Sequence, residues 1–335
     1  MHVKFLPKKD RDNIIKINAA FLLVSIIWGA ANPIIKFSLD YIPPFTFLFL
    51  RFLLIGIVVF PIIYFQLKKE PIHKEDYGNF FLLGLFSQTA LALTFVGLKY
   101  TTSLDYTIIG IMSSVLTVYA GHYFYKDKIN KWIKIGLLIA SLGTFLIVLE
   151  PAVAGNTGDH TPLERIFGNI LAVANALTWV VFIIWSKFSM GQKSGMLKKT
   201  LSFVHLKPMK RNYSPTTVIM ITFYVALVTF IPLAIIENLY IPLETPFNIL
   251  TMDVKAVIGI LYTSLLSSIT AYWLHQWALA NSKVSNAAIF AYLSPVFTVP
   301  FAYLILGELP NTLVIIGATL IAVGVILAEA NNHDI

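Results

Sequence analysis

The sequence contains no cysteine, which excludes disulfide bonds and thiolate metal sites. Charged residues are also scarce: they make up 13% of the 335 residues, whereas hydrophobic residues make up 57%. Soluble domains carry about 25% charged and about 45–50% apolar residues. A chain of this length could not hide so much apolar surface from water, so the composition indicates an integral membrane protein.

Motifs of catalysis and of ATP binding are missing as well. The sequence has no His-Glu-x-x-His zinc motif and no Gly-x-x-x-x-Gly-Lys-Ser/Thr loop. None of its 17 acidic residues lies in the middle of a long apolar run, so paired intramembrane aspartates are also absent. We therefore expect neither catalytic residues, nor a metal, nor a cofactor, and no pump driven by ATP.

Ten apolar segments are long enough to cross a membrane, which takes roughly 20 residues per helix. The sequence thus predicts an all-α integral membrane protein with ten transmembrane helices. The predicted spans are 16–37, 44–67, 78–98, 102–125, 131–150, 166–187, 215–236, 254–278, 283–306 and 311–330.

The distribution of basic residues predicts the orientation. If the N-terminus lies in the cytoplasm, only Lys36, Lys99, Arg165 and Lys255 fall on the outer side, and Arg51 lies within a span. All the remaining lysines and arginines, of 25 in total, lie on the inner side. Cytoplasmic segments of membrane proteins carry such an excess, so both termini are predicted to be cytoplasmic. The net charge of +8 therefore reflects basic loops rather than a nucleic-acid-binding patch.

The two halves of the chain repeat each other. A shift of 181 residues places 84–148 on 265–329 without a gap, and it aligns Gly136 with Gly317 and Gly143 with Gly324. Shifts of 171 and 151 align earlier segments, for example Trp28 with Trp179, and each change of shift falls in a loop. Because each half has five spans, the second must enter from the opposite face. The sequence predicts two inverted five-helix repeats, an architecture that places a substrate site at the repeat interface.

The predicted organisation follows from this repeat. Residues 1–15 form a cytoplasmic segment, 16–150 the first repeat, 151–165 an external linker, 166–330 the second repeat with a cytoplasmic insertion at 188–214, and 331–335 a cytoplasmic tail. The seven-residue spacing of the paired glycines puts both members on one helix face, which predicts close helix packing without chemistry.

The sequence contains the run Trp28-Gly29-Ala30-Ala31-Asn32-Pro33, Arg51 within Phe-Leu-Arg-Phe, and Ser294-Pro295-Val296-Phe297-Thr298 followed by Gly307-Glu308 and Gly317. In these features it resembles the EamA family of the drug/metabolite transporter superfamily. The resemblance covers about 16–330 and implies a ten-helix transporter of small metabolites, often amino acids, with a central cavity between the halves. The first half departs from the pattern, because Ser114 and Lys126-Asp127 replace the proline and Gly-Glu of the second.

Candidate substrate-binding residues are polar or aromatic side chains within the spans. Trp28 and Asn32 share one helix face, and Asn175 and Trp179 repeat this arrangement in the sixth span. Polar groups that faced lipid would lack partners, so these faces should point inward. Lining a cavity is favoured over hydrogen bonding between helices. Gln88 and Tyr272 are similar candidates.

Arg51 and two prolines complete the candidates. Arg51 either binds an anionic group such as a substrate carboxylate, forms an ion pair with Asp105 or Glu150, or extends toward the lipid headgroups. A structural role is favoured, because the resemblance carries this arginine across many substrates. Pro33 and Pro295 are hinge candidates, although a static kink is the simpler interpretation of each.

We therefore predict a secondary transporter, an exporter of small metabolites such as amino acids, that works by alternating access in the plasma membrane. The alternative is a non-transporting membrane scaffold or receptor-like protein. The predicted partners are a small-molecule substrate and membrane lipids, and a homodimer is left open.

Overall fold

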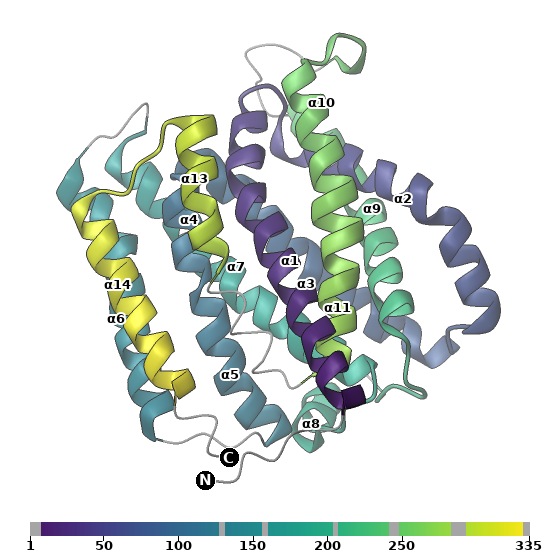
Figure 1. Ribbon diagram of the computed structural model, residues 1–335. Helices are drawn as coiled ribbons and strands as arrows, with labels where there is room; N and C mark the ends of the chain where they lie inside the picture. The colour runs from purple at the N-terminus through teal and green to yellow at the C-terminus, as the bar shows by residue number, and fades with distance from the viewer. Residues whose placement is uncertain are drawn as a thin grey trace.

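The computed structural model describes residues 8–126, 131–155, 160–203, 207–240, 248–282 and 293–330. The regular structure of these residues is helical and forms one bundle (Figure 1). The first half contributes α1 (Lys8–Leu39), α2 (Pro44–Lys69), α3 (Tyr77–Tyr100), α4 (Ser103–Gly110), α5 (Met112–Tyr125) and α6 (Lys131–Ala154). The second half contributes α7 (Pro162–Ser189), α8 (Gly195–Phe203), α9 (Pro215–Tyr240), α10 (Val254–Leu261), α11 (Ala271–Ala280), α13 (Ser294–Leu306) and α14 (Thr312–Ala330).

Local sequence signals set many of the helix ends. Thr161 and Glu164 form a capping box at the start of α7, and Thr102 accepts a hydrogen bond from the backbone N–H of Asp105 at the start of α4. Lys126 after α5 and Gly307 after α13 adopt left-handed conformations, which end the helices.

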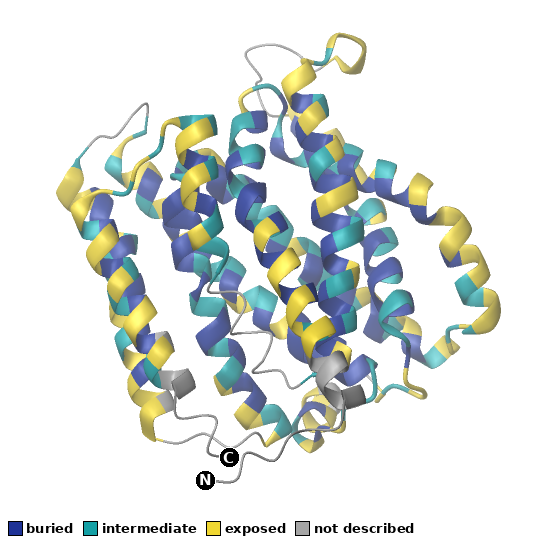
Figure 2. Cartoon of the chain, viewed as in Figure 1, coloured by how far each residue is buried: buried dark blue, intermediate teal, exposed yellow. Residues whose placement is uncertain are grey.

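The lengths and surfaces of the helices suit a lipid bilayer. Within the described residues, eight helical segments are long and apolar enough to cross a membrane, and two shorter apolar helices are Ser294–Leu306 and Thr312–Gly324. Large apolar side chains such as Phe60, Phe145 and Leu304 are exposed on the outside of the bundle (Figure 2). Water would oppose such a surface, whereas lipid accepts it. The protein is a multi-pass integral membrane protein.

Helix packing repeats between the two halves. α2 packs on α9, and α6 packs on α14, so each of these helices meets its own counterpart. α1 packs on α11, and its counterpart α7 packs on α3. Likewise, α1 contacts α13 as α7 contacts α5. A twofold axis that relates the two repeats explains this pattern. Under such an axis, a helix contact between the repeats either pairs a helix with its own counterpart or occurs a second time between the counterparts of the two helices.

The glycines of α6 and α14 show that the copies run in opposite directions. A Cβ atom built on Gly143 would lie 2.6 Å from the carbonyl oxygen of Gly317, and one built on Gly324 would meet that of Gly136. The sequence repeat equates Gly136 with Gly317 and Gly143 with Gly324. The contact of Gly143 with Gly317 is therefore repeated between their counterparts, Gly324 and Gly136. Because the later residue of α6 meets the earlier residue of α14, the two helices are antiparallel. The predicted inverted repeat and the close packing of these glycines are confirmed.

Two lysines repeat the relation at opposite ends of the bundle. The Nζ atom of Lys36, at the end of α1, donates to the carbonyl oxygen of Thr101 at 2.6 Å. Lys187, at the end of α7, donates to the carbonyl oxygen of Ser282. Ser282 is the counterpart of Thr101 at the shift of 181, and Lys187 is the counterpart of Lys36 at the shift of 151. Each lysine side chain therefore joins the end of the first helix of its half to the loop between the third and fourth spans of the same half.

One segment breaks the symmetry and was not predicted. Residues Tyr262–Thr270 connect α10 to α11 as a π-helical segment within one continuous span. The counterpart stretch of α3 is an ordinary α-helix. The first part of the predicted span 283–306, residues 283–292, lies outside the described residues, and α13 covers the remainder from Ser294.

Candidate functional site

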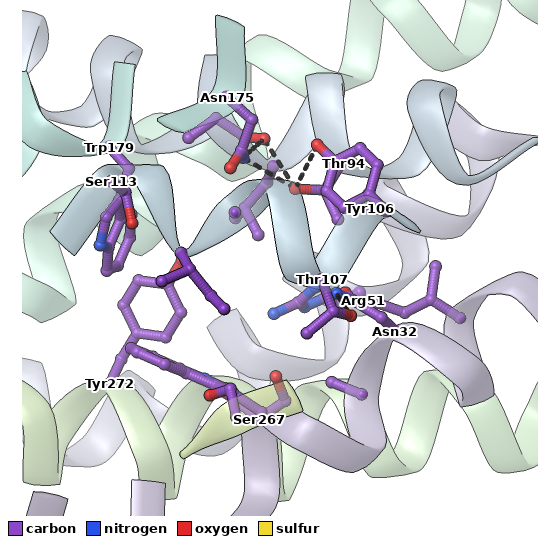
Figure 3. Close-up of a pocket in the computed structure, with 18 residues that line it drawn as sticks. Asn32, Arg51, Thr94, Tyr106, Thr107, Ser113, Asn175, Trp179, Ser267 and Tyr272 are labelled. Atoms are coloured by element: carbon purple, nitrogen blue, oxygen red, sulfur yellow. Dashed lines mark hydrogen bonds between the residues drawn. The ribbon is translucent and has the colours of Figure 1, made fainter. Parts of the chain in front are cut away.

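A cavity of about 190 Å³ lies among helices of both halves. Its lining comes from α1, α2, α3, α4, α5, α7, α11, α13 and the π-helical segment, and Figure 3 shows the side chains that surround it. Six of the seven predicted substrate-binding residues are in this lining: Trp28, Asn32, Arg51, Asn175, Trp179 and Tyr272. The two repeats thus bring together, around one cavity, residues that are far apart in the sequence.

One wall of the cavity is aromatic. The ring centroids of Trp28 and Trp179, which occupy equivalent positions in the two repeats, lie 5.6 Å apart and nearly perpendicular. Tyr272 completes a triangle with them, at 5.4 Å from Trp28 and 5.7 Å from Trp179. Edge-to-face pairs at these distances are favourable, so the three rings hold each other in place. His275 packs behind Trp28 at 5.2 Å and is buried.

Another wall carries neutral hydrogen-bonding groups. The side-chain amide of Asn175 donates to the carbonyl oxygen of Ala90 at 2.6 Å and to the hydroxyl of Thr94 at 2.9 Å. The Tyr106 hydroxyl donates to Thr94 at 3.4 Å, so three side chains from α3, α4 and α7 form one chain of bonds (Figure 3). Asn32 donates to the hydroxyl of Thr107 at 2.8 Å. These groups keep further hydrogen-bonding capacity for a bound molecule.

The π-helical segment supplies partners to two cavity residues. The indole N–H of Trp28 donates to the carbonyl oxygen of Ser267 at 3.0 Å. The Ser268 hydroxyl accepts from Arg51 Nε at 2.9 Å and from Arg51 Nη2 at 2.6 Å. π-Helical turns change the direction of side chains and carbonyl groups and occur often at functional sites. Here the segment turns its serines toward α1 and α2.

Arg51 is the one charged residue of the described cavity lining. Its side chain is 1% exposed, and its guanidinium lies 5.6 Å from the ring of Phe52 and 5.7 Å from that of Phe95. Its Nη1 atom is buried without a hydrogen-bond partner. Arg51 therefore neither reaches the headgroups nor meets Asp105 or Glu150, so both of those predicted alternatives are wrong.

A polar layer follows the cavity toward the end of the bundle where α1 ends. Lys36, one turn beyond Asn32, forms an ion pair with Glu308 at 3.0 Å. Glu308 also accepts from the backbone N–H of Ser103 at 2.8 Å and from its hydroxyl at 2.5 Å, and so caps α4. Ser103 is one turn before the cavity residue Thr107, so this layer lies one helical turn from the cavity lining.

Comparison with known proteins decides the family. The sequence model of the EamA-like transporter family matches residues 15–149 and 194–329, which is most of the chain. The chain belongs to the EamA-like transporter family. Its members are transporters rather than enzymes, and a non-transporting scaffold is not favoured.

Several relatives match most of the length of this EamA-like transporter. It is 27% identical over 320 residues to an uncharacterized transporter of Archaeoglobus fulgidus, covering 95% of this chain and 99% of that one. It is 24% identical over 308 residues to a probable amino-acid metabolite efflux pump of Salmonella typhimurium, covering 90% and 91%. A solved structure with 17% identity superposes with a TM-score of 0.58 over 95% of this chain and 98% of the other, which supports the fold alone.

Gln88 lies away from the cavity of this EamA-like transporter. Its side-chain oxygen accepts a hydrogen bond from the Thr229 hydroxyl on α9, so it joins α3 to α9. The sequence could not separate this role from cavity lining, because both put a polar side chain on an inward face. Pro33 lies inside the continuous helix α1, and Pro295 lies in the first turn of α13, where proline fits without a break.

Sequence reasoning missed Thr94, Thr107 and Ser267, which also line the cavity of this transporter. Threonine and serine in a span commonly bond to the carbonyl one turn earlier, and Thr94 and Thr107 both do so. Their presence in the sequence therefore carries little information about a site.

Proposed function

We propose that this chain is a secondary exporter of small amino-acid-like metabolites that works by alternating access around the central cavity. One observation carries the proposal: both repeats contribute to a cavity that combines an aromatic wall, a neutral hydrogen-bonding wall and one buried cation. Transporters built from inverted repeats bind substrate at such an interface.

The size and chemistry of the cavity set the substrate class. Pockets for drug-sized ligands have volumes of about 300–1,000 Å³, whereas this cavity has about 190 Å³. That volume suits a small metabolite with an apolar or aromatic part against Trp28, Trp179 and Tyr272. The relatives named as probable amino-acid metabolite efflux pumps agree with this class and with export.

The membrane placement belongs to the same proposal. Both termini lie in the cytoplasm and the protein resides in the plasma membrane, as the basic residues of the inner loops favour. In Figure 1, α1 begins and α14 ends at the same end of the bundle, as this orientation needs. We also propose ten spans, arranged in repeats over 16–150 and 166–330. The packing of α7 on α3, which matches that of α1 on α11, supports this arrangement. Membrane lipids then contact the exposed apolar side chains.

Counterflow in proteoliposomes tests the transport function. The protein would be reconstituted with pooled labelled amino acids and related carboxylates. We expect saturable uptake by the wild type and loss of most of it in Trp179→Ala, because the aromatic wall loses a member. Trp132→Ala is the matched control, since Trp132 is 38% exposed on α6 and remote from the lining. Saturable uptake that Trp179→Ala leaves unchanged would show that the cavity is not the substrate site.

A further inference from the structure

We propose that Arg51 binds the carboxylate of the substrate and that the cavity selects monocarboxylates with an apolar or aromatic side group. This inference rests on the proposed function only in taking the cavity as the substrate site. It assigns a ligand class that neither the family nor the names of the relatives supply, because amino-acid metabolites include acids, amines and neutral amides.

The first step is the hydrogen-bond inventory of the guanidinium. An arginine side chain has five N–H donors in a planar fork. Two of its nitrogen atoms, Nε and Nη2, share a single acceptor, the hydroxyl of Ser268. The third, Nη1, is buried without a partner, although Arg51 lines the cavity. Donor capacity is therefore left over in a side chain that lines the cavity.

The second step is the charge. Within the described residues Arg51 forms no ion pair, and no acidic residue lines the cavity. An ionised group taken out of water is costly unless an opposite charge and hydrogen bonds compensate it. Flanking by Phe52 and Phe95 compensates only part of that cost. A carboxylate in the cavity would supply both the charge and two acceptor oxygens in the fork geometry that guanidinium matches.

The third step excludes other ligand classes. A cationic amine would meet one positive charge and no carboxylate, so the cavity disfavours it. A phosphate ester carries more negative charge than one arginine can balance, and binding such a ligand requires several basic residues. The ammonium of an amino acid finds only neutral acceptors such as the Thr94 and Thr107 hydroxyls. Binding should therefore need the carboxylate and not the ammonium.

The fourth step places the remainder of the molecule. Trp28, Trp179 and Tyr272 form a rigid aromatic wall of the same cavity, and no charged group of the described lining lies there. Aromatic rings prefer to pack against other rings or aliphatic groups. The site thus combines one anion-binding group with one apolar surface, which is the pattern of an arylalkanoate.

Ligand affinity of the purified full-length protein tests the inference. The probes are 3-phenylpropanoate, its neutral amide 3-phenylpropanamide, and phenethylamine, which share the ring and differ in charge. Wild-type protein should bind the carboxylate at least about tenfold more tightly than the amide or the amine, as expected of charged hydrogen bonds. Phenylalanine should bind no more tightly than 3-phenylpropanoate.

Variants assign that preference to Arg51. Arg51→Gln should lower the affinity for the carboxylate at least about tenfold and leave that for the amide unchanged. Arg51→Lys keeps the charge but loses the fork, so its affinity should be intermediate. Lys255→Gln removes a charge outside the cavity and should change nothing. Should Arg51→Gln fail to fold, the wild-type comparison of the three probes still decides the matter.

The outcomes separate the two proposals. Equal wild-type affinities for carboxylate, amide and amine would overturn the carboxylate inference even if counterflow of metabolites succeeds. Tight carboxylate binding that Arg51→Gln abolishes would uphold the inference even if no transport is found. Preference for phenethylamine would overturn it outright, because it would require a buried negative partner.

Discussion

At the scale of single residues, Arg165 compensates two buried carboxylates. Its Nη2 atom lies 2.8 Å from Asp105 Oδ2 and 2.7 Å from Glu150 Oε2, and all three side chains are at most 3% exposed. Asn311 also donates to Glu150, which connects α4, α6 and α7 to the start of α14. Neither carboxylate has another basic partner among the described ion pairs, so Arg165 alone balances these two buried charges.

Arg165→Met should be strongly destabilising, by about 3–5 kcal/mol, because it leaves two buried charges without a cation. Thermal unfolding of the detergent-solubilised protein measures the loss. Adding Asp105→Asn and Glu150→Gln to Arg165→Met should restore much of the stability, since no unpaired charge then remains. An Arg165→Met protein that unfolds like the wild type would contradict this account of the network.

Glu70 at the end of α2 gives stability that depends on pH. It accepts from the hydroxyl of Ser214 at 2.7 Å and from the backbone N–H of Ser214 at 3.1 Å, which caps α9. Burial raises the pKa of Glu70, but the hydrogen bonds from Thr217 and Ser214 outweigh burial and hold that pKa below its usual value. The ionised form is therefore the one that stabilises the fold.

Glu70→Gln should lower the unfolding free energy by about 1 kcal/mol at pH 7, as expected for a helix cap. A depressed pKa contributes stability that is full above the ordinary carboxyl pKa, about 4.3, and is lost as the pH falls through the lower folded value. The gap between wild type and Glu70→Gln should thus shrink below about pH 4. Melting curves at several pH values measure it, with exposed Lys69→Gln as a control. A gap that is constant with pH would contradict the assignment.

The sequence was informative about single residues where the bilayer makes polarity expensive. Trp28, Asn32, Asn175 and Trp179 stand out for that reason, and all four line the cavity. It was uninformative about partners. Arg51 is bonded to Ser268, 217 positions away, and no periodicity identifies one serine among the many in the spans. The acids that charge alone suggested belong to Arg165 instead.

At the scale of helices, the contact of α6 with α14 depends on glycine. A Cβ atom on Gly143 would lie 2.6 Å from the Gly317 carbonyl oxygen and 2.9 Å from Ile321 Cγ1. Neither backbone can retreat without moving a whole helix. Close approach of this kind is how helices associate in lipid, where the hydrophobic effect does not drive them together.

Gly143→Ala should therefore cost about 1–3 kcal/mol through overpacking. Gly195→Ala is the matched control, because no atom lies within 4 Å of its added Cβ and alanine favours a helix. The thermal midpoints of the two variants in detergent should move in opposite directions or only the first should fall. Equal behaviour of the two would refute close packing as the role of Gly143.

Helix identity could be predicted because spans need long apolar runs, but helix type could not. The stretch Tyr262–Thr270 is rich in serine and threonine, as are many α-helical spans, and in the π-helical form two of its side chains bond to α1 and α2. The hydroxyl of Tyr262 bonds to the Ile27 carbonyl and that of Ser264 to the Arg51 carbonyl. These are tertiary interactions that a single-sequence pattern does not contain.

At the scale of the molecule, the Lys36–Glu308 pair fastens α1 to the turn after α13 across the polar layer. Under alternating access this layer must open to release substrate on that side. The chain contains no cysteine, so a single introduced cysteine reports on access without background.

Glu308→Gln should increase access to the cavity from that side. In an Asn32→Cys background, a membrane-impermeant thiol reagent should react about fivefold faster when Glu308 is replaced, as loss of about 1 kcal/mol from the closed state implies. Glu75→Gln, at the opposite end of the bundle, should leave the rate unchanged. A rate that Glu308→Gln does not alter would show that the ion pair does not hold this side closed.

The reciprocal glycine contacts of α6 and α14 have a consequence for how such a protein diversifies. Under the proposed alternating access, the pairing of α6 with α14 maps onto itself and would keep its geometry, as would that of α2 with α9, so we expect these pairs to serve as pivots. The contact of α6 with α14 is built from backbone and glycine and lies apart from the cavity lining. Side chains that line the cavity can therefore be substituted one by one without changing the glycine contact between α6 and α14.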